Sequence, residues 1–182
     1  MTTSDLEPRI AALFDALASL GIATDTVRHP PVLTVDEAKR HRVRHHGTHV
    51  KNLFLRNKKG AMWLVVLHED RVVDLRELGR RIGAGHVSFG SAERLREHLG
   101  VEPGSVTPLA AWCDRRGAVR VVLDRVIFAS DPVHCHPLSC DRTTSLSASD
   151  LVRFLRHTGH EPELLDLDAP TDPALAERGA RA

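Results

Sequence analysis

The stretch VKNLFLRNKKGAMWLVVLHE at residues 50–69 decides the fold class, because it has the pattern of a β-hairpin. VKNLFLRN at 50–57 and AMWLVVLHE at 61–69 are rich in apolar and β-branched residues, and KKG at 58–60 supplies a turn between them. An antiparallel pair of strands is therefore expected near the centre of the molecule.

Helical patterns surround this hairpin. Ser4 and Glu7 have the spacing of a capping box, and apolar residues then recur at helical spacing up to Gly21. Further helices are expected in four places: from Thr34, from Asp74 to about Gly83, from Ser91 to Gly100, and from Ser147 to Gly159.

Further strands are expected at residues 26–28 and 86–89, at LAAWC (109–113) and VRVVL (119–123), around 134–136, and at ELLDL (163–167). DRRG at 114–117 would form a hairpin turn. Because strands occur in hairpins as well as between helices, the sequence predicts an α+β fold. Its mixed, mostly antiparallel sheet would be flanked by helices.

The bulk composition fits one domain. The chain has 182 residues, of which 42% are hydrophobic, and we expect a domain at 1–168 followed by a mobile tail at 169–182. Apolar runs such as VVL at 65–67 fall far below the roughly 20 residues that span a bilayer. The N-terminus resembles no signal peptide, so we expect a cytoplasmic protein with no membrane partner.

Basic residues gather between positions 39 and 59, where eight Lys or Arg occur without Asp or Glu although the net charge is only +1. Such a stripe can bind a phosphate backbone, and a solvated basic loop is the alternative. The candidate phosphate contacts are Arg40, Arg42, Arg44, Arg56, Lys58 and Lys59.

Two features near the hairpin carry candidate chemistry. Side chains alternate across a strand, so Lys51 shares a face with Leu53 and Leu55, and a partly buried ammonium needs an anion or a carbonyl partner. A lysine that extends to water is the alternative. GSVTP at 104–108 predicts a tight loop whose N–H groups can cradle an oxygen, although an ordinary connector has the same pattern.

The segment HCHPLSC at 134–140 leaves further alternatives open. His134, Cys135, His136 and Cys140 are zinc-ligand types, but the spacing lacks a paired-cysteine knuckle, so no metal and no cofactor are expected. Cys140 follows His136 by four residues, which also permits a Cys–His nucleophile. Buried, inert cysteines are the commoner outcome.

Taken in order, HPPVLTVDEA, KNLFLRNKKG, WLVVL, VSFGSAERLREHLGVEPGSVTPLA, HPL and TTSLSASDLVRFL resemble the free-standing prolyl-tRNA editing proteins. These are YbaK-like deacylases related to the editing insertion of bacterial prolyl-tRNA synthetase. The resemblance covers roughly residues 5–167 and implies a YbaK-like fold. It further implies hydrolysis of mischarged tRNA(Pro), chiefly alanyl-tRNA(Pro), and prolyl-tRNA synthetase as a further partner.

The resemblance also assigns roles to residues. Lys51, beside Asn52, would hold the 3′-terminal adenosine or its phosphate, while His136 would bound the aminoacyl pocket. Val32 and Leu33 would meet the small side chain of the substrate. The family loop corresponds to Gly104, Ser105, Val106, Thr107 and Pro108, and the expected catalytic set is Lys51, Gly104 and His136.

The chain departs from the family pattern after HPL, where SCDRTTSLS stands in place of a segment like VNTATTSIS. Cys140 replaces a usual asparagine, and Asp141 and Arg142 form a charged pair. The departure leaves the amino-acid specificity open between alanyl-tRNA and cysteinyl-, seryl- or threonyl-tRNA.

The chemistry needs no dedicated nucleophile, because an aminoacyl ester is already activated. A positioned water, backbone N–H groups and the ribose hydroxyl of the substrate would suffice. Lys51 would then be an electrostatic anchor, since an ordinary lysine is protonated at pH 7. The expected function is a trans-editing hydrolase, and a tRNA-binding module without turnover is the alternative.

Overall fold

The computed structural model describes residues 3–31, 39 and 46–169, and every structural statement below refers to these residues. The helices are α1 (Thr3–Ser19), α3 (Leu75–Arg81), α4 (Ala92–Leu99) and α5 (Ala148–His157), with 3-10 helices η1 (Pro108–Cys113) and η2 (Arg125–Phe128). The strands are β1 (Asp25–Arg28), β2 (Thr48–Asn57), β3 (Met62–His68), β4 (Val87–Phe89), β5 (Val119–Asp124), β6 (Val133–Cys135), β7 (Arg142–Leu146) and β8 (Glu163–Leu165).

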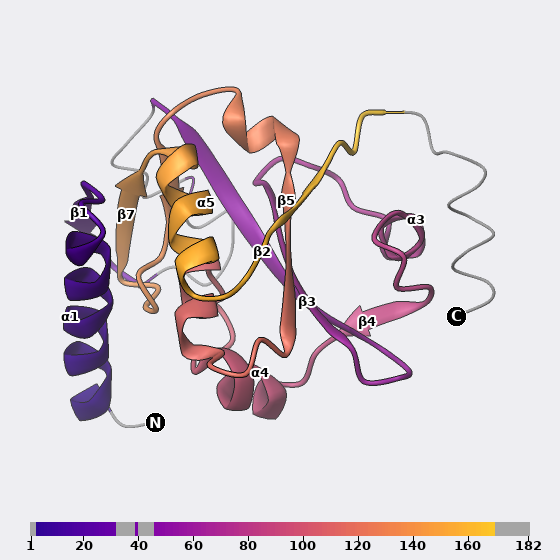
Figure 1. The fold of residues 1–182 in the computed structure, drawn as a ribbon, viewed down its shortest axis with the longest axis horizontal. Coiled ribbons are helices and arrows are strands. Elements are labelled where there is room, and N and C mark those ends of the chain that lie inside the picture. The colour runs from indigo at the N-terminus through magenta and orange to yellow at the C-terminus, as the bar shows by residue number, and fades with distance from the viewer. Residues whose placement is uncertain (1–2, 32–38, 40–45, 170–182) are drawn as a thin grey trace.

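One sheet organises these strands in the order β1-β7-β6-β2-β3-β5-β8, and β4 pairs with β2 beside that path. The pairs β1–β7, β2–β3, β2–β4 and β6–β7 are antiparallel, whereas β2–β6, β3–β5 and β5–β8 are parallel. The predicted α+β fold with a mixed, mostly antiparallel sheet is confirmed, and the hairpin at 50–69 lies at its centre (Figure 1).

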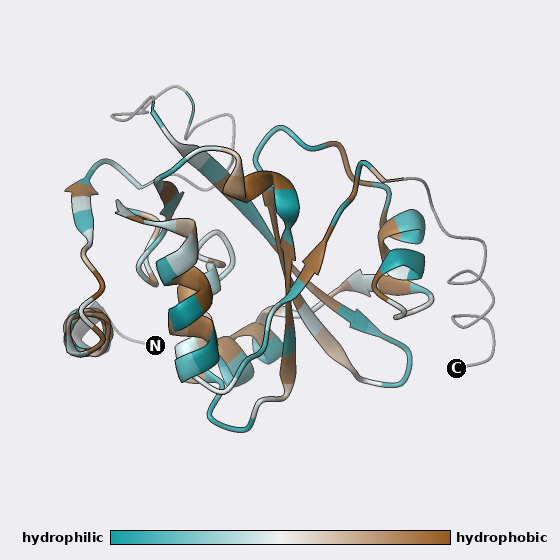
Figure 2. Ribbon diagram, turned by 45° about the horizontal axis from the view of Figure 1, so that its top comes forward, coloured by the Kyte–Doolittle hydropathy of each residue, from teal (hydrophilic) through white to brown (hydrophobic). Residues whose placement is uncertain are grey.

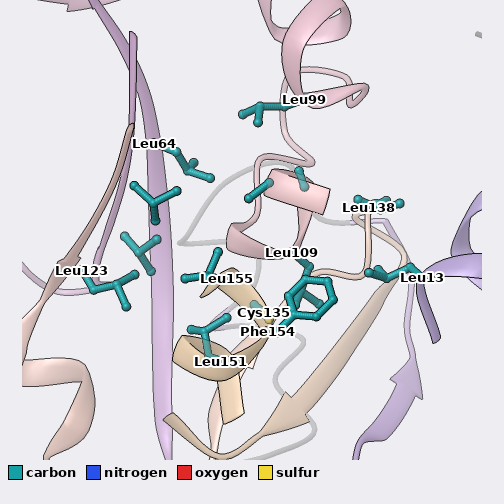
Figure 3. Packing of buried hydrophobic residues seen from close by; sticks show 14 of the residues in the cluster. Leu13, Leu64, Leu99, Leu109, Leu123, Cys135, Leu138, Leu151, Phe154 and Leu155 are labelled. Atoms are coloured by element: carbon teal, nitrogen blue, oxygen red, sulfur yellow. The ribbon is translucent and has the colours of Figure 1, made fainter. Parts of the chain in front are cut away.

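Strand β3 is buried on both faces and separates two hydrophobic clusters. Leu64 and Val66 point into the larger cluster, and Trp63 and Val65 point into the smaller one, as strand alternation requires. Helices α1, α4 and α5 supply the larger cluster, in which Leu64 and Leu123 of the sheet face α5 (Figure 3). Helix α3 closes the smaller cluster, so helices cover both faces of the sheet.

The exterior follows this arrangement. In Figure 2 the central strands and the inner side of α5 are brown, whereas the turn of the β2–β3 hairpin and the outer side of α5 are teal. No helix in the described part of the chain is both long enough and apolar enough to cross a bilayer.

Three predicted helix starts are confirmed by their caps, and the first is Asp74, whose carboxylate accepts from the N–H of Arg76 at the start of α3. The Ser91 hydroxyl accepts from the N–H of Arg94, and the Ser147 hydroxyl accepts from the N–H of Asp150. Gly100 ends α4 in the left-handed conformation at φ 61°, which glycine adopts without steric cost. The capping box predicted at Ser4 and Glu7 does not begin α1, because this helix already begins at Thr3.

The prediction of a strand at LAAWC was wrong. Residues 108–113 form η1, in which Pro108 occupies the first turn and the Thr107 hydroxyl accepts from the N–H of Leu109. Proline fixes φ near −65° and so favours a helical start, whereas a short apolar run alone does not distinguish strand from helix. DRRG at 114–117 is therefore a helix-to-strand turn, and β5 lies parallel to β3.

Several predictions fall on parts of the chain that the structure does not describe. The helix expected from Thr34 and most of the loop expected at 40–49 lie outside the described residues, although β2 already begins at Thr48. The tail from residue 170 also lies outside them, and the domain boundary after residue 168 stays a prediction.

Candidate functional site

The edge of β2 that faces away from β3 has no described strand paired with it along its middle. Strand β6 pairs with this edge at Thr48 and His49, and β4 pairs with it at 55–57. Across residues 50–54 no described strand lies alongside, and the N–H of Gly90 reaches the carbonyl of Phe54 at 2.9 Å. The parallel strands β2 and β6 thus separate after His49, so Lys51 and Asn52 lie on an edge of β2 that no described strand pairs with.

Asn52 joins this opening to the turn at 104–108. Its side-chain amide donates to the carbonyl oxygen of Val106 at 2.9 Å, while Gly104 takes the left-handed conformation at φ 90°. Thr107 is fully buried, and its side chain also contacts the thiol of Cys135 at the end of β6. The structure therefore brings Asn52 and the predicted loop together.

Polar groups at this contact are left without partners. For the backbone N–H groups of Val106 and Thr107 the described residues provide no acceptor, whereas the N–H of Ser105 donates to the carbonyl of Glu102 at 2.9 Å. The amide oxygen of Asn52 is buried and has no hydrogen-bond partner among the described residues. Unsatisfied buried polar groups are rare in folded proteins, so the amide oxygen of Asn52 needs a physical explanation.

Lys51 lies on the opposite face of β2 from Asn52, with Leu53 and Leu55 as the alternation predicted. Its ammonium is partly buried and donates to the backbone carbonyl oxygen of Arg71. Burial lowers the pKa of Lys51, because desolvation penalises the charged amine. This hydrogen bond uses one of the three N–H groups of the ammonium. The side chains of Lys51 and Asn52 therefore point to opposite faces of β2 at its open edge.

The carbonyl that receives Lys51 belongs to an anchored residue. Nε of Arg71 lies 2.5 Å from Oδ2 of Asp124, whose carboxylate is almost completely buried. Two further nitrogens of Arg71 donate to Asp168 at 2.8 and 2.9 Å. Because both carboxylates hold the guanidinium, the backbone at Arg71 offers Lys51 a fixed acceptor.

His136 follows the end of β6 and has a defined proton position. Its Nδ1 lies 2.9 Å from the carbonyl oxygen of Arg142, and since a carbonyl only accepts, Nδ1 carries the hydrogen. Burial lowers the pKa of His136, and the ring of His29 lies 6.3 Å from its ring. Nε2 has no partner in the described part of the chain and so presents a lone pair.

Other predicted site residues lie apart or are not described. Val32, Leu33, Arg40, Arg42 and Arg44 fall outside the described residues. Arg56 lies near the far end of β2, and Lys58 and Lys59 are exposed at the hairpin turn. At roughly 3.3 Å a residue, Lys58 is about 23 Å along the strand from Lys51, so these cations do not share one contact region with it.

In the segment at 134–140, His134 is engaged in hydrogen bonds within the fold and Cys135 is buried. His134 is buried between Ser145 and the carbonyl of His46, at 2.9 and 2.6 Å, and both ring nitrogens are engaged. Complete burial raises the pKa of the Cys135 thiol to about 12. Within the described residues no group of three His, Cys, Asp or Glu side chains is placed to hold a metal ion.

Sequence reasoning missed two arginines that shape the site. Arg71 and Arg142 each offer a backbone carbonyl to a predicted site residue, and carboxylates hold both guanidinium groups. The charged pair at 141–142 was a visible signal for Arg142. Arg71 carries no local signal, because its partners at 124 and 168 are distant in sequence.

Comparison with known proteins gives consistent findings. Residues 29–154 match the family model of the aminoacyl-tRNA editing domain. A cattle (Bos taurus) protein named prolyl-tRNA synthetase associated domain-containing protein 1 is 39% identical over 163 residues, which cover 87% of this chain and 95% of the relative. The prolyl-tRNA editing protein ProX of Acetoanaerobium sticklandii is 32% identical over 157 residues, which cover 86% and 96%.

Among solved structures, one described as a candidate trans-editing enzyme for prolyl tRNA synthetase superposes with a TM-score of 0.68 at 22% identity. The superposition covers 87% of this chain and 96% of that one. At this identity the likeness concerns the fold alone.

Proposed function

Because this chain belongs to the aminoacyl-tRNA editing-domain family, whose YbaK-like members include a prolyl-tRNA editing protein, we propose that it is an aminoacyl-tRNA deacylase. Its substrate is tRNA(Pro) that carries a wrong amino acid, chiefly alanine. The reaction is hydrolysis of the ester that joins the amino acid to the terminal ribose.

The observation that carries this proposal is the hydrogen bond from Asn52 to Val106. It holds the turn at 104–108 beside the open edge of β2, with the N–H group of Val106 uncommitted among the described residues. A backbone N–H group placed beside an ester carbonyl stabilises the charge that develops on its oxygen when water attacks. The turn is thus suited to an oxyanion site.

Lys51 and His136 take the remaining roles in this scheme. Lys51 places a positive charge near the phosphate or ribose of the terminal adenosine, and the carbonyl of Arg71 restrains its ammonium. Nε2 of His136 accepts a hydrogen bond from the substrate, either from its α-ammonium group or from its ribose hydroxyl. Water attacks the carbonyl carbon, the bond to the ribose oxygen breaks, and that oxygen receives a proton.

Selection of alanine follows from size. A synthetase pocket that accepts proline distinguishes a side chain smaller by one or two methylenes by only about 10–200-fold, so a second and smaller pocket is needed. A pocket that admits alanine and excludes proline provides that second selection. Contacts from the basic residues to the acceptor end, and an encounter with prolyl-tRNA synthetase, belong to the same proposal.

A panel of mischarged tRNAs tests the function. Purified protein is mixed with alanyl-, cysteinyl-, seryl- and threonyl-tRNA(Pro), and release of the amino acid is followed against the spontaneous rate. We expect fastest release of alanine. Preference for another amino acid would replace the specificity, and binding without release from any of them would leave a non-catalytic tRNA-binding module.

A further inference from the structure

A buried arginine beside the site is held by two carboxylates from different parts of the chain. Arg142, at the start of β7, is 4% exposed. Its guanidinium donates to Glu7 of α1 at 2.5 and 3.2 Å and to Asp141 at 2.8 and 3.0 Å. We call these three side chains the Arg142 clamp.

The clamp has the chemistry of a fixed structure. A buried guanidinium is costly unless its donors are satisfied, and here four hydrogen bonds to two carboxylates meet that need. The same contacts lower the pKa of Glu7 and bring the pKa of Asp141 down to about 2. Bidentate pairs of this kind fix direction as well as distance.

The loop at 136–142 is held at further points. Leu138 is fully buried, adopts φ 67°, and points into the cluster that contains Leu13 (Figure 3). A left-handed conformation costs a non-glycine residue about 1–2 kcal/mol, so it persists where packing determines it. The hydroxyl of Ser139 donates to Asp141 at 2.5 Å, which ties the loop to the clamp.

Arg142 therefore connects two functions in one residue. Its side chain is fixed by the clamp, and its carbonyl oxygen receives the Nδ1–H of His136 at 2.9 Å. If the Arg142 backbone moved, the hydrogen bond from Nδ1 of His136 would break. The ring could then exchange between its two neutral forms. The orientation of a histidine ring is commonly set by the partner of its second nitrogen.

We propose that Arg142 is a positioning residue: Glu7 and Asp141 hold its guanidinium, and its carbonyl oxygen keeps the His136 ring in the form whose Nε2 accepts a hydrogen bond from the substrate. The inference rests on the proposed function. It also gives α1 a role in the site, although Glu7 lies outside the segment at 29–154 that matches the editing-domain model.

The test combines nitrogen NMR with kinetics on the full chain. Two-bond 15N–1H spectra of uniformly labelled protein identify which nitrogen of His136 carries the hydrogen. In wild type we expect hydrogen on Nδ1. In Glu7→Ala and Arg142→Lys we expect a mixture of the two neutral forms and an approximately tenfold fall in kcat for alanyl-tRNA(Pro), with KM nearly unchanged.

Arg28→Gln is the matched control, because exposed Arg28 lies 3.7 Å from Glu7 and takes no part in the clamp. It should leave the nitrogen spectrum and kcat as in wild type. Glu7 is half exposed, so Glu7→Ala should fold even where Arg142→Lys does not, and the amide spectrum away from the loop checks this.

Unchanged His136 resonances in folded Glu7→Ala overturn the proposal, and so does an altered ring form with unchanged kcat. If wild type releases no amino acid from any mischarged tRNA, the proposed function fails instead. The nitrogen spectra of the variants still decide whether the clamp sets the form of His136.

Discussion

The side-chain amide of Asn52 donates a hydrogen bond of 2.9 Å to the backbone carbonyl oxygen of Val106. This contact joins the open edge of the central strand β2 to the turn at 104–108, which is 54 residues away in sequence. The reverse orientation of the amide would bring two oxygen atoms together, so the donor is assigned by its partner. The candidate site depends on this hydrogen bond.

Asn52→Ala should release the turn and lower hydrolysis of alanyl-tRNA(Pro). Loss of one hydrogen bond costs about 1 kcal/mol of stability, and misplaced turn N–H groups should slow the reaction by tenfold or more. Urea unfolding and initial rates measure the two effects. Asn57→Ala is the control, because Asn57 accepts from the N–H groups of Lys59 and Ala61 and donates to the carbonyl oxygen of Ala84, away from the turn at 104–108. It should destabilise the protein at least as much without the loss of rate, and equal losses of rate would contradict the role of Asn52.

Lys51 and the hairpin lysines should respond differently to the size of the substrate. Lys51→Ala should lower kcat/KM roughly hundredfold both for alanyl-tRNA(Pro) and for the alanyl ester of adenosine monophosphate, since it acts at the terminal nucleotide. Lys58→Ala should affect the full tRNA alone and reduce the salt slope of binding by about 1. Rates on both substrates at several salt concentrations check this. Full activity of Lys51→Ala would remove this residue from the site.

The cysteines should not act as nucleophiles. Cys135 is fully buried with a pKa raised to about 12, so its thiolate is scarce at pH 8 and iodoacetamide should leave it unlabelled in the folded protein. Cys140→Ala should retain activity within about twofold. Mass spectrometry after labelling and a rate measurement decide the point. A loss above tenfold in Cys140→Ala would restore the Cys–His alternative.

Asp141 should stabilise the fold in a pH-dependent manner. Its pKa falls from 3.8 to about 2 on folding, chiefly through the hydrogen bond from Arg142. Since the folded-state pKa is the lower one, this stabilisation is complete above about pH 4 and disappears as the pH falls toward 2. After allowance for partial exposure, Asp141→Asn should cost about 1–2 kcal/mol at pH 7.

Urea unfolding at pH 7, 4 and 2 measures this difference, which should vanish at the lowest pH. Glu161→Gln provides the comparison, because Glu161 forms an exposed pair with Arg156 and should change the unfolding midpoint little at any pH. A difference for Asp141→Asn that persists at pH 2 would contradict the assigned cause.

Local patterns predicted the elements whose causes are local. The hairpin at 50–69 follows from alternating apolar residues around a turn, and α4 and α5 follow from their serine caps. LAAWC failed because its five apolar residues fit strand and helix equally, and Pro108 with Thr107 decided for a 3-10 helix.

The sequence by itself determined the fold class and the family, and its short motifs singled out Lys51, Asn52, His136 and the turn at 104–108 as candidates for the site. Tertiary structure alone decided that Asn52, and not Lys51, holds the turn, and that Arg71 and Arg142 supply the carbonyls that hold Lys51 and His136. The physical reason is distance along the chain: Arg71 meets Asp168 across 97 residues and Arg142 meets Glu7 across 135. Such contacts are made when packing of the whole domain brings distant charges together, and no local pattern encodes them.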